Sequence, residues 1–288
     1  MMTPSTSQKS LQETSTRPCP SPHLTRVPMT SPSNGFITFA SLQIMRYITQ
    51  WSSLFFSIGL PIIFYLIYGA GIDYGNSTFP HGNITAFVMI GMALYGGVTA
   101  AVSSAGQTIM EHSTGWGRQL ALTPMSTLRI VSAQATLVII SSALPITAVY
   151  IVGFLTGSEM EPWAWIASYL ICIVACLPFG FYGYALALAI PKPSTLSLAS
   201  GSVVILGFIG NLFMPLDGIL LQIGRFTPLY GAAGLSRRPI TEGLSPTNAM
   251  ASGSATEPLW IPLLNVLAWT IILVALSIKL NRRDKSRV

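Results

Sequence analysis

Six long runs of uncharged, mostly apolar residues constrain this chain more than any other feature of its sequence. A hydrocarbon core about 30 Å thick needs roughly 20 such residues in a helix. The runs therefore predict an all-α integral membrane protein with six transmembrane helices. They contain no Asp, Glu, Lys, Arg or His, and they cover residues 51–70, 84–107, 130–156, 163–190, 194–215 and 260–278.

Composition agrees with a body that faces lipid. The chain is 51% hydrophobic and 8% charged, whereas soluble domains carry about 25% charged residues. A net charge of +6 without a basic patch on a folded soluble face gives no indication of a nucleic-acid partner. Cys172 and Cys176 stand one helical turn apart in an apolar run, which favours a packing role over metal binding. No metal site is predicted.

The charges between the runs predict an orientation. With the N-terminus inside, twelve of the fifteen basic residues lie in cytoplasmic segments, and only Arg225, Arg237 and Arg238 lie outside. The first two outer connections, residues 71–83 and 157–162, contain no Lys or Arg. Because short cytoplasmic loops carry an excess of Lys and Arg, both termini are expected in the cytoplasm.

The N-terminal part differs from the rest of the chain. Residues 1–34 are crowded with Ser, Thr and Pro and predict a disordered cytoplasmic tail. Residues 35–288 form the transmembrane domain, which begins with an interfacial helix predicted over residues 36–49. Both Met1 and Met29 remain open as the start of translation.

Within the runs, small residues and prolines predict how the helices pack. Pro145 and Pro178 are expected to bend their helices without breaking them. Glycines are expected to permit close contact between helices; they are Gly91, Gly96, Gly97, Gly207 and Gly210.

The sequence also bears on the energy source. Carriers coupled to protons or sodium usually keep ionisable groups at mid-membrane, and these runs have none. No Gly-x-x-x-x-Gly-Lys-Ser/Thr loop occurs in the chain, so it has no P-loop of its own for ATP. An uphill transporter of this composition needs a partner ATPase, and this chain is expected to bind no cofactor.

The connection after the second run, residues 111–126, has the most patterned polar content. Two glycines allow the chain to turn, Trp116 and Leu120 stand one helical turn apart, and Pro124 keeps Thr123 out of helical geometry. A short helix parallel to the membrane surface is one interpretation. An ordinary interfacial loop anchored by Trp116 is the other.

This connection resembles the cytoplasmic signature of ABC type-2 transporter permeases, the transmembrane subunits of ATP-binding-cassette exporters. Trp116 and Arg118 lie within the same segment, and Ser113 departs from the second acidic residue that many members carry. The resemblance covers roughly residues 36–288. It implies that the segment is a coupling helix that docks on an ATP-binding subunit. The matching residues are Glu111, Gly115, Leu120, Thr123 and Pro124.

The resemblance further implies a function. The chain is expected to be a non-catalytic permease subunit in a bacterial-type plasma membrane, paired with a second copy or a related permease. Mg-ATP would bind in the partner subunit. The cargo would be hydrophobic or amphipathic, such as a drug, an antibiotic or a lipid-like molecule. Outward transport rests on the resemblance alone, and both the cargo and the choice between homodimer and heterodimer stay open.

The connection between the fifth and sixth runs contains two apolar pieces too short to cross the membrane. Residues 218–226 and 229–235 predict re-entrant or interfacial helices, and the resemblance implies a helical hairpin in the outer leaflet. Asn211 and Met214 lie near the outer end of the fifth run. They are candidates for the substrate path, although packing explains both equally well.

Two other classes of protein fit the sequence less well. A secondary carrier built from inverted repeats has no support from internal similarity between the halves. A membrane-embedded lipid-modifying enzyme, such as a lipid transferase, needs clustered acids or histidines. Glu111 and His112 are the only such neighbours. The three histidines, His23, His81 and His112, are expected to be isolated and solvated.

Overall fold

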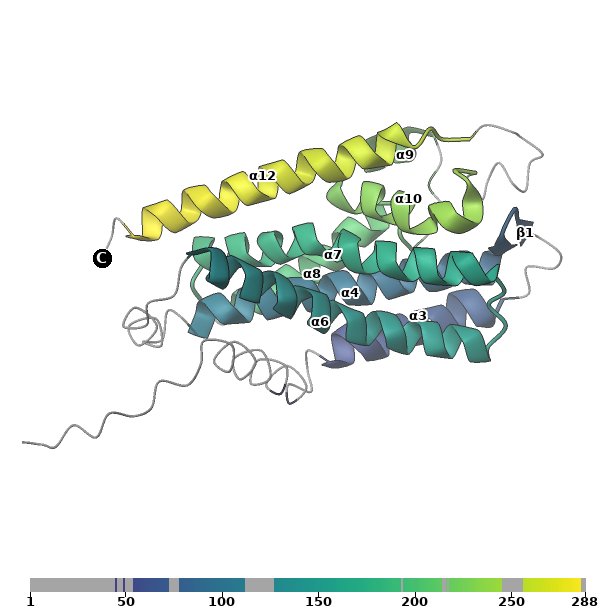
Figure 1. Ribbon diagram of the computed structural model, residues 1–288, viewed down its shortest axis with the longest axis horizontal. Coiled ribbons are helices and arrows are strands. Elements are labelled where there is room, and N and C mark those ends of the chain that lie inside the picture. Colours follow the sequence, from purple (N-terminus) through teal and green to yellow (C-terminus); the bar gives the residue numbers. More distant parts are fainter. Residues whose placement is uncertain are drawn as a thin grey trace, which may run out of the picture.

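The computed structural model is a helical bundle with an elongated shape (Figure 1). It describes residues 45, 49, 54–72, 78–111, 127–192, 194–213, 216, 218–244 and 256–285. The side chains of Glu111 and of residues 127–134 and 282–285 are not included. The predicted tail and nearly all of the predicted interfacial helix therefore lie outside the described residues.

Four described helices are long and apolar enough to cross a membrane. They match the second, third, fourth and sixth runs, as the sequence predicted. They are α4 (Ile84–Glu111), α6 (Thr127–Leu155), α7 (Pro162–Ala189) and α12 (Trp260–Lys285). α6 and α7 continue through Pro145 and Pro178. The described part of the chain is thus a multi-pass, all-α membrane protein.

The fifth run forms a shorter helix than expected, whereas the first run is helical over all of its described residues. Phe55–Ala70 consists of α3 (Leu60–Tyr65) between two π-helical segments, η1 (Phe55–Gly59) and η2 (Leu66–Ala70). α8 (Ser194–Ile209) has 16 residues. It ends six residues before the expected boundary at 215 because Asn211 adopts a left-handed conformation (φ 60°) that a helix cannot continue through.

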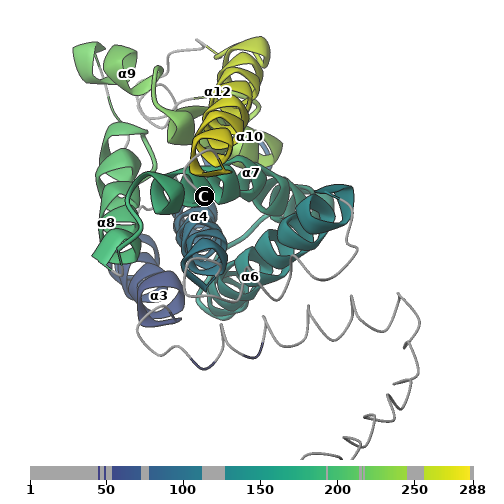
Figure 2. The same ribbon diagram turned by 90° about the vertical axis from the view of Figure 1, so that its left-hand side faces the viewer.

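α4 is the central helix of the bundle. Figure 2 looks along the bundle and shows α4 with α3, α6, α7 and α8 around it. In the most apolar 18-residue stretch of α4, 89% of the residues are buried. A Cβ added at Gly97 would lie 2.8 Å from the Sγ of Cys176 and 2.8 Å from Ile146. The predicted packing roles of this glycine and of Cys176 are confirmed.

Hydroxyl pairs link the helices where charges are absent. Ser104 on α4 pairs with Ser141 on α6 at 2.9 Å, and Tyr182 on α7 pairs with Ser202 on α8 at 2.7 Å. Such bonds contribute about 0.6 kcal/mol each in a membrane. These bonds orient the helices relative to one another without placing a charged side chain in the membrane.

Two helices occupy the connection before α12, as predicted. α9 (Gly218–Gly224) is exposed, with Ile219 at 76%. α10 (Pro228–Thr241) packs instead against α7, α12 and α4, and most of its side chains are buried. Figure 1 shows α10 between α7 and α12.

A short hairpin marks one end of the bundle. Strands β1 (Thr78–Phe79) and β2 (Gly82–Asn83) are antiparallel, and Thr78 pairs with Asn83. Gly82 also bridges to Met160 in the connection between α6 and α7. This end is called the hairpin end below; the last turn of α4, the first turn of α6 and the C-terminus of α12 lie at the opposite end (Figure 1).

Candidate functional site

The residues of the predicted coupling helix are bounded by two described helices. Glu111 is the last residue of α4, and Thr127 begins α6. The connection of residues 112–126 therefore joins the central helix to a neighbour packed along it, at the end opposite the hairpin. Six of the predicted coupling residues lie outside the described residues, as does Met214: Gly115, Trp116, Arg118, Leu120, Thr123 and Pro124.

Asn211, the other predicted path residue, closes the turn after α8. Its side-chain Oδ1 accepts a hydrogen bond from the backbone N–H of Leu216 at 2.8 Å. Its own backbone carbonyl accepts one from Arg237 at 2.8 Å. Asn tolerates the left-handed conformation better than most residues, so this turn accounts for Asn at position 211. The path role stays a prediction.

Arg237 is a buried cation that joins three elements. Its side chain is on α10, and the residue is 5% exposed. The guanidinium donates to the carbonyls of Asn211 (2.8 Å) and Leu212 (2.6 Å) after α8, and to that of Phe87 on α4 (3.2 Å). It also lies 3.8 Å from the centre of the Phe87 ring. Backbone carbonyls and an aromatic face thus solvate the charge.

The position of these carbonyls suits a cation. Asn211 and Leu212 follow the C-terminus of α8, where unpaired carbonyls and the helix dipole concentrate negative potential. Among the described residues, Arg237 forms no ion pair with a carboxylate. We infer that Arg237 terminates α8 and fixes α10 against α4.

Gly91 leaves room for this guanidinium, which gives a first prediction. A Cβ at Gly91 would lie 2.2 Å from Nη2 of Arg237 and 2.9 Å from the carbonyl of Leu212. Gly91→Ala is expected to lower the free energy of unfolding by about 1–3 kcal/mol through overpacking. Thermal unfolding in detergent measures it.

The matched control is Gly201→Ala on α8, where an added Cβ meets nothing within 4 Å. This change should leave stability unchanged or raise it slightly, because Ala favours a helix over Gly. Equal stability of the two variants would refute the assigned role of Gly91.

At the surface of the hairpin end, His81 joins two carboxylates. Its Nδ1 lies 3.0 Å from Oε1 of Glu161, and its Nε2 lies 3.0 Å from Oε1 of Glu242. Both ring nitrogens can donate together only when the imidazole is charged. These three residues, called the histidine clasp below, connect the hairpin to the segments before α7 and after α10. The expectation that His81 is isolated was wrong, although the residue does lie at the surface as expected.

The clasp predicts a pH dependence. The hydrogen bond to Glu161 and, to a smaller extent, the hydrogen bond to Glu242 raise the pKa of His81 above 6.5. His81 in turn lowers the pKa of Glu161. As long as both carboxylates stay ionised, the charged clasp therefore stabilises the hairpin end fully below pH 6.5, and this stabilisation is lost as pH rises through the raised pKa of His81. NMR titration of the ¹³C-labelled imidazole of His81 in detergent should give a midpoint above 6.5.

Two carboxylate variants test the cause of this shift. Glu161→Gln should lower the midpoint of His81, whereas Glu159→Gln, on an exposed residue two positions away, should leave it in place. A His81 midpoint at or below 6.5 in the unmodified protein would contradict the clasp.

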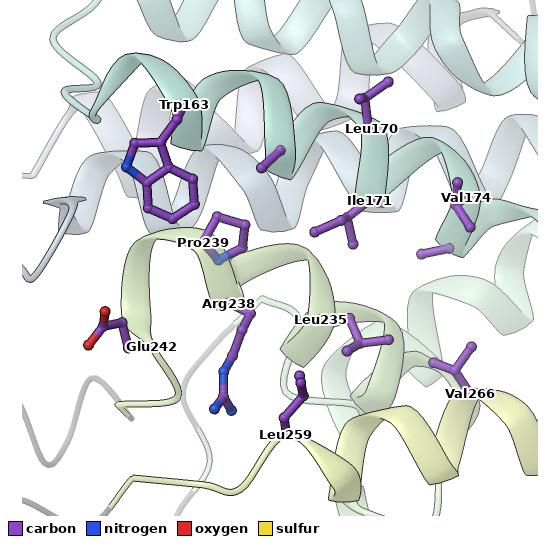
Figure 3. A pocket seen from close by; sticks show the side chains of 12 residues that line it. Trp163, Leu170, Ile171, Val174, Leu235, Arg238, Pro239, Glu242, Leu259 and Val266 are labelled. Atoms are coloured by element: carbon purple, nitrogen blue, oxygen red, sulfur yellow. The ribbon is translucent and has the colours of Figure 1, made fainter.

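An open groove of about 850 Å³ lies beside the clasp (Figure 3). Its walls come from the first half of α7, the end of α10 and the beginning of α12. Leu170, Val174 and Leu235 are among its apolar lining residues, and Arg238 and Glu242 lie at its polar end. Figure 3 shows the labelled lining residues on α7, on the end of α10 and at the beginning of α12.

Sequence reasoning missed the roles of Arg237 and His81. A signal for Arg237 was present, because an Arg directly follows the short apolar segment 229–235. No local signal identifies the clasp, since Glu161 and Glu242 are 80 and 161 residues from His81.

Comparison with known proteins adds a relative. No family model matches the chain. The chain is 22% identical over 247 residues to a protein of Bacillus subtilis (strain 168) named "Putative transport permease YvfS". The match covers 84% of this chain and 92% of that protein. This chain is a distant homologue of a transport permease. The match supports the resemblance to ABC type-2 permeases and a place among multi-pass membrane transport proteins.

Proposed function

We propose that the chain is the transmembrane permease subunit of an ABC exporter. It pairs with a second copy or a related permease and moves a hydrophobic or amphipathic substrate out of the cell across the plasma membrane. A separate ATP-binding subunit supplies the energy. One observation carries the proposal: the chain has six apolar runs free of ionisable residues and no P-loop, and the segment 111–126 with the coupling pattern joins its second and third runs.

The arrangement of α4 supports a mechanism. A helix of 28 residues is about 42 Å long, enough to cross the membrane, and α4 carries the coupling segment at one end. Near its other end, the Phe87 carbonyl and ring hold Arg237. In the proposed cycle, ATP binding displaces residues 111–126, and rigid α4 transmits this movement to α8 and α10.

This proposal orients the protein. The hairpin end faces the outside, and the opposite end, with both termini, faces the cytoplasm. Residues 1–34 are then a cytoplasmic tail, and residues 35–288 form the permease domain. The uncharged character of the membrane helices suits an uncharged or amphipathic cargo, because a charged one would find no partner there.

Cysteine labelling tests the orientation. In a Cys19→Ser background, Ser77→Cys and Asn248→Cys should react with a membrane-impermeant maleimide in intact cells. Ser126→Cys should react only after permeabilisation, since short loops rich in Lys and Arg stay inside. The reverse labelling pattern would overturn the orientation.

Purification tests the partner. The tagged chain, extracted in mild detergent from its native membrane, should bring with it a subunit that carries a P-loop and hydrolyses ATP. A parallel preparation with Glu111→Ala and Pro124→Ala together should retain less of this subunit. A chain that purifies without a nucleotide-binding protein under crosslinking conditions would count against the exporter assignment.

A further inference from the structure

The groove between α7, α10 and α12 is amphipathic along its length. Its apolar part opens toward the membrane, because Leu170 and Val174 on α7 are 54% and 62% exposed. Its other end contains Arg238 and Glu242, which Figure 3 shows at the last turn of α10. Trp163, in the first turn of α7, lines the same end. Polar and apolar parts are thus separated along the groove.

The length of the apolar part fits one leaflet of a bilayer. α7 begins at Pro162, and its stretch long enough to span the membrane begins there as well. Val174 is eleven residues beyond Trp163, which corresponds to about 16 Å along a helix. Half of a hydrocarbon core measures about 15 Å. A molecule with its polar group beside Arg238 would therefore have its apolar chain within one leaflet, as a membrane lipid has.

The charges at the polar end select among lipids. Arg238 donates from Nη1 to the backbone carbonyl of Glu257 at 2.6 Å, and it forms no ion pair among the described residues. A guanidinium with further N–H groups suits a phosphate. Glu242 uses Oε1 for His81, and a carboxylate can accept several more hydrogen bonds. An ammonium group is its natural partner.

We propose that this groove binds one molecule of phosphatidylethanolamine from the surrounding leaflet. The phosphate pairs with Arg238, the ammonium donates to Glu242, and one acyl chain lies along α7 beside Leu170 and Val174. Glu242 disfavours an anionic headgroup that lacks an ammonium. The quaternary ammonium of a choline headgroup has no N–H to donate to that carboxylate.

Bound lipid would also complete the packing of α12. This helix is fastened near the opposite end by the Ser277 hydroxyl, which donates to the Phe181 carbonyl at 3.1 Å. At the hairpin end, Asn265 donates to the carbonyl of Arg225 at 2.6 Å. In the most apolar 18-residue stretch of α12, only 17% of the residues are buried. A lipid in the groove between α7 and Val266 of α12 adds contacts to α12, so binding should raise thermal stability.

The experiment uses the full-length protein, purified in detergent and stripped of lipid. Palmitoyl-oleoyl phosphatidylethanolamine, phosphatidylcholine and phosphatidylglycerol are added separately, and binding is followed by native mass spectrometry and by thermal unfolding. The ethanolamine lipid should bind most tightly and raise the melting temperature most. Arg238→Gln should weaken its binding by about tenfold, the usual effect of losing one charge-assisted contact.

Three further changes separate site binding from general destabilisation. Glu242→Gln should abolish the preference for ethanolamine over choline lipid. Ala167→Phe, which fills the groove and leaves Arg238 intact, should abolish tight binding. The matched change Ile166→Phe, on a 66% exposed neighbour outside the groove lining, should not. A photoactivatable ethanolamine lipid should crosslink to residues 163–175.

Equal stabilisation by all three lipids would show annular lipid only and would overturn the proposal. Tighter binding of phosphatidylglycerol would do the same, as would unchanged ethanolamine-lipid binding in Ala167→Phe. None of these measurements uses ATP or transport. Their failure therefore leaves the exporter assignment standing, and the reverse also holds.

Discussion

Complexes with Glu111→Ala or Pro124→Ala are expected to insert and hydrolyse ATP while losing most of their export activity. The proposed coupling helix transmits force, so its disruption breaks the link between nucleotide and cargo rather than either part. A coupling free energy of about 1–3 kcal/mol corresponds to a 5- to 150-fold effect. Export should thus fall by at least about fivefold relative to ATP hydrolysis in vesicles that contain the complex.

Matched controls lie at the opposite end of the molecule. Glu159→Ala and Pro258→Ala replace the same residue types at exposed positions near the hairpin end. Both should retain the normal ratio of export to hydrolysis. If the Glu111 and Pro124 variants also retain that ratio, segment 111–126 is an ordinary interfacial loop.

Loss of the buried cation should have the largest effect on stability. Arg237→Met removes the donor to three carbonyls and leaves those of Phe87, Asn211 and Leu212 without their partner. A buried acceptor left without its donor costs about 1–3 kcal/mol, and more than one carbonyl loses its donor here. Arg237→Lys should be intermediate, because one ammonium cannot reproduce the planar fork of a guanidinium. Chemical or thermal unfolding in detergent measures the series.

Arg225→Met is the control for this series. Arg225 is on the same connection before α12, but its side chain is 42% exposed and pairs with Glu257 at 3.3 Å. Exposed pairs contribute about 0–1 kcal/mol, so stability should change little. Comparable losses in the Arg225 and Arg237 variants would show that the three carbonyls do not depend on Arg237.

The sequence predicted the parts of the fold that depend on long apolar runs. Length and absence of charge located α4, α6, α7 and α12, because these properties are what a bilayer requires. It overestimated the fifth run, since hydropathy continues past Ile209 while the backbone turns at Asn211. That turn is fixed by Arg237, a tertiary contact from 26 residues away. Composition alone cannot reveal it.

The same distinction between local patterns and contacts of distant segments applies to the candidate site. The coupling residues come from a local pattern, and six of the seven lie outside the described residues, so their role stays a prediction. Arg237 and the histidine clasp depend on contacts between distant segments. In particular, His81 contacts Glu161 and Glu242 only after three connections have met at the hairpin end.

Together these contacts make the hairpin end a connected unit. Arg237 ties α10 to α4 and to the turn after α8, and Glu242, just after α10, joins the clasp. A displacement of α4 would therefore reach α8 and α10 through hydrogen bonds as well as packing. In the proposed exporter, this is the end from which the substrate leaves.

The most direct test of the account is ATP-dependent export in a defined membrane. Inverted vesicles would contain either the purified chain alone or the chain with its co-purified ATP-binding subunit. They would receive ATP in the external medium, which the cytoplasmic face contacts, and would be assayed for accumulation of a hydrophobic fluorescent dye and of a fluorescent phospholipid. The account predicts accumulation only with both proteins, and its loss when the P-loop lysine of the partner is replaced. Uphill accumulation by this chain alone, driven by an ion gradient and insensitive to ATP, would contradict it.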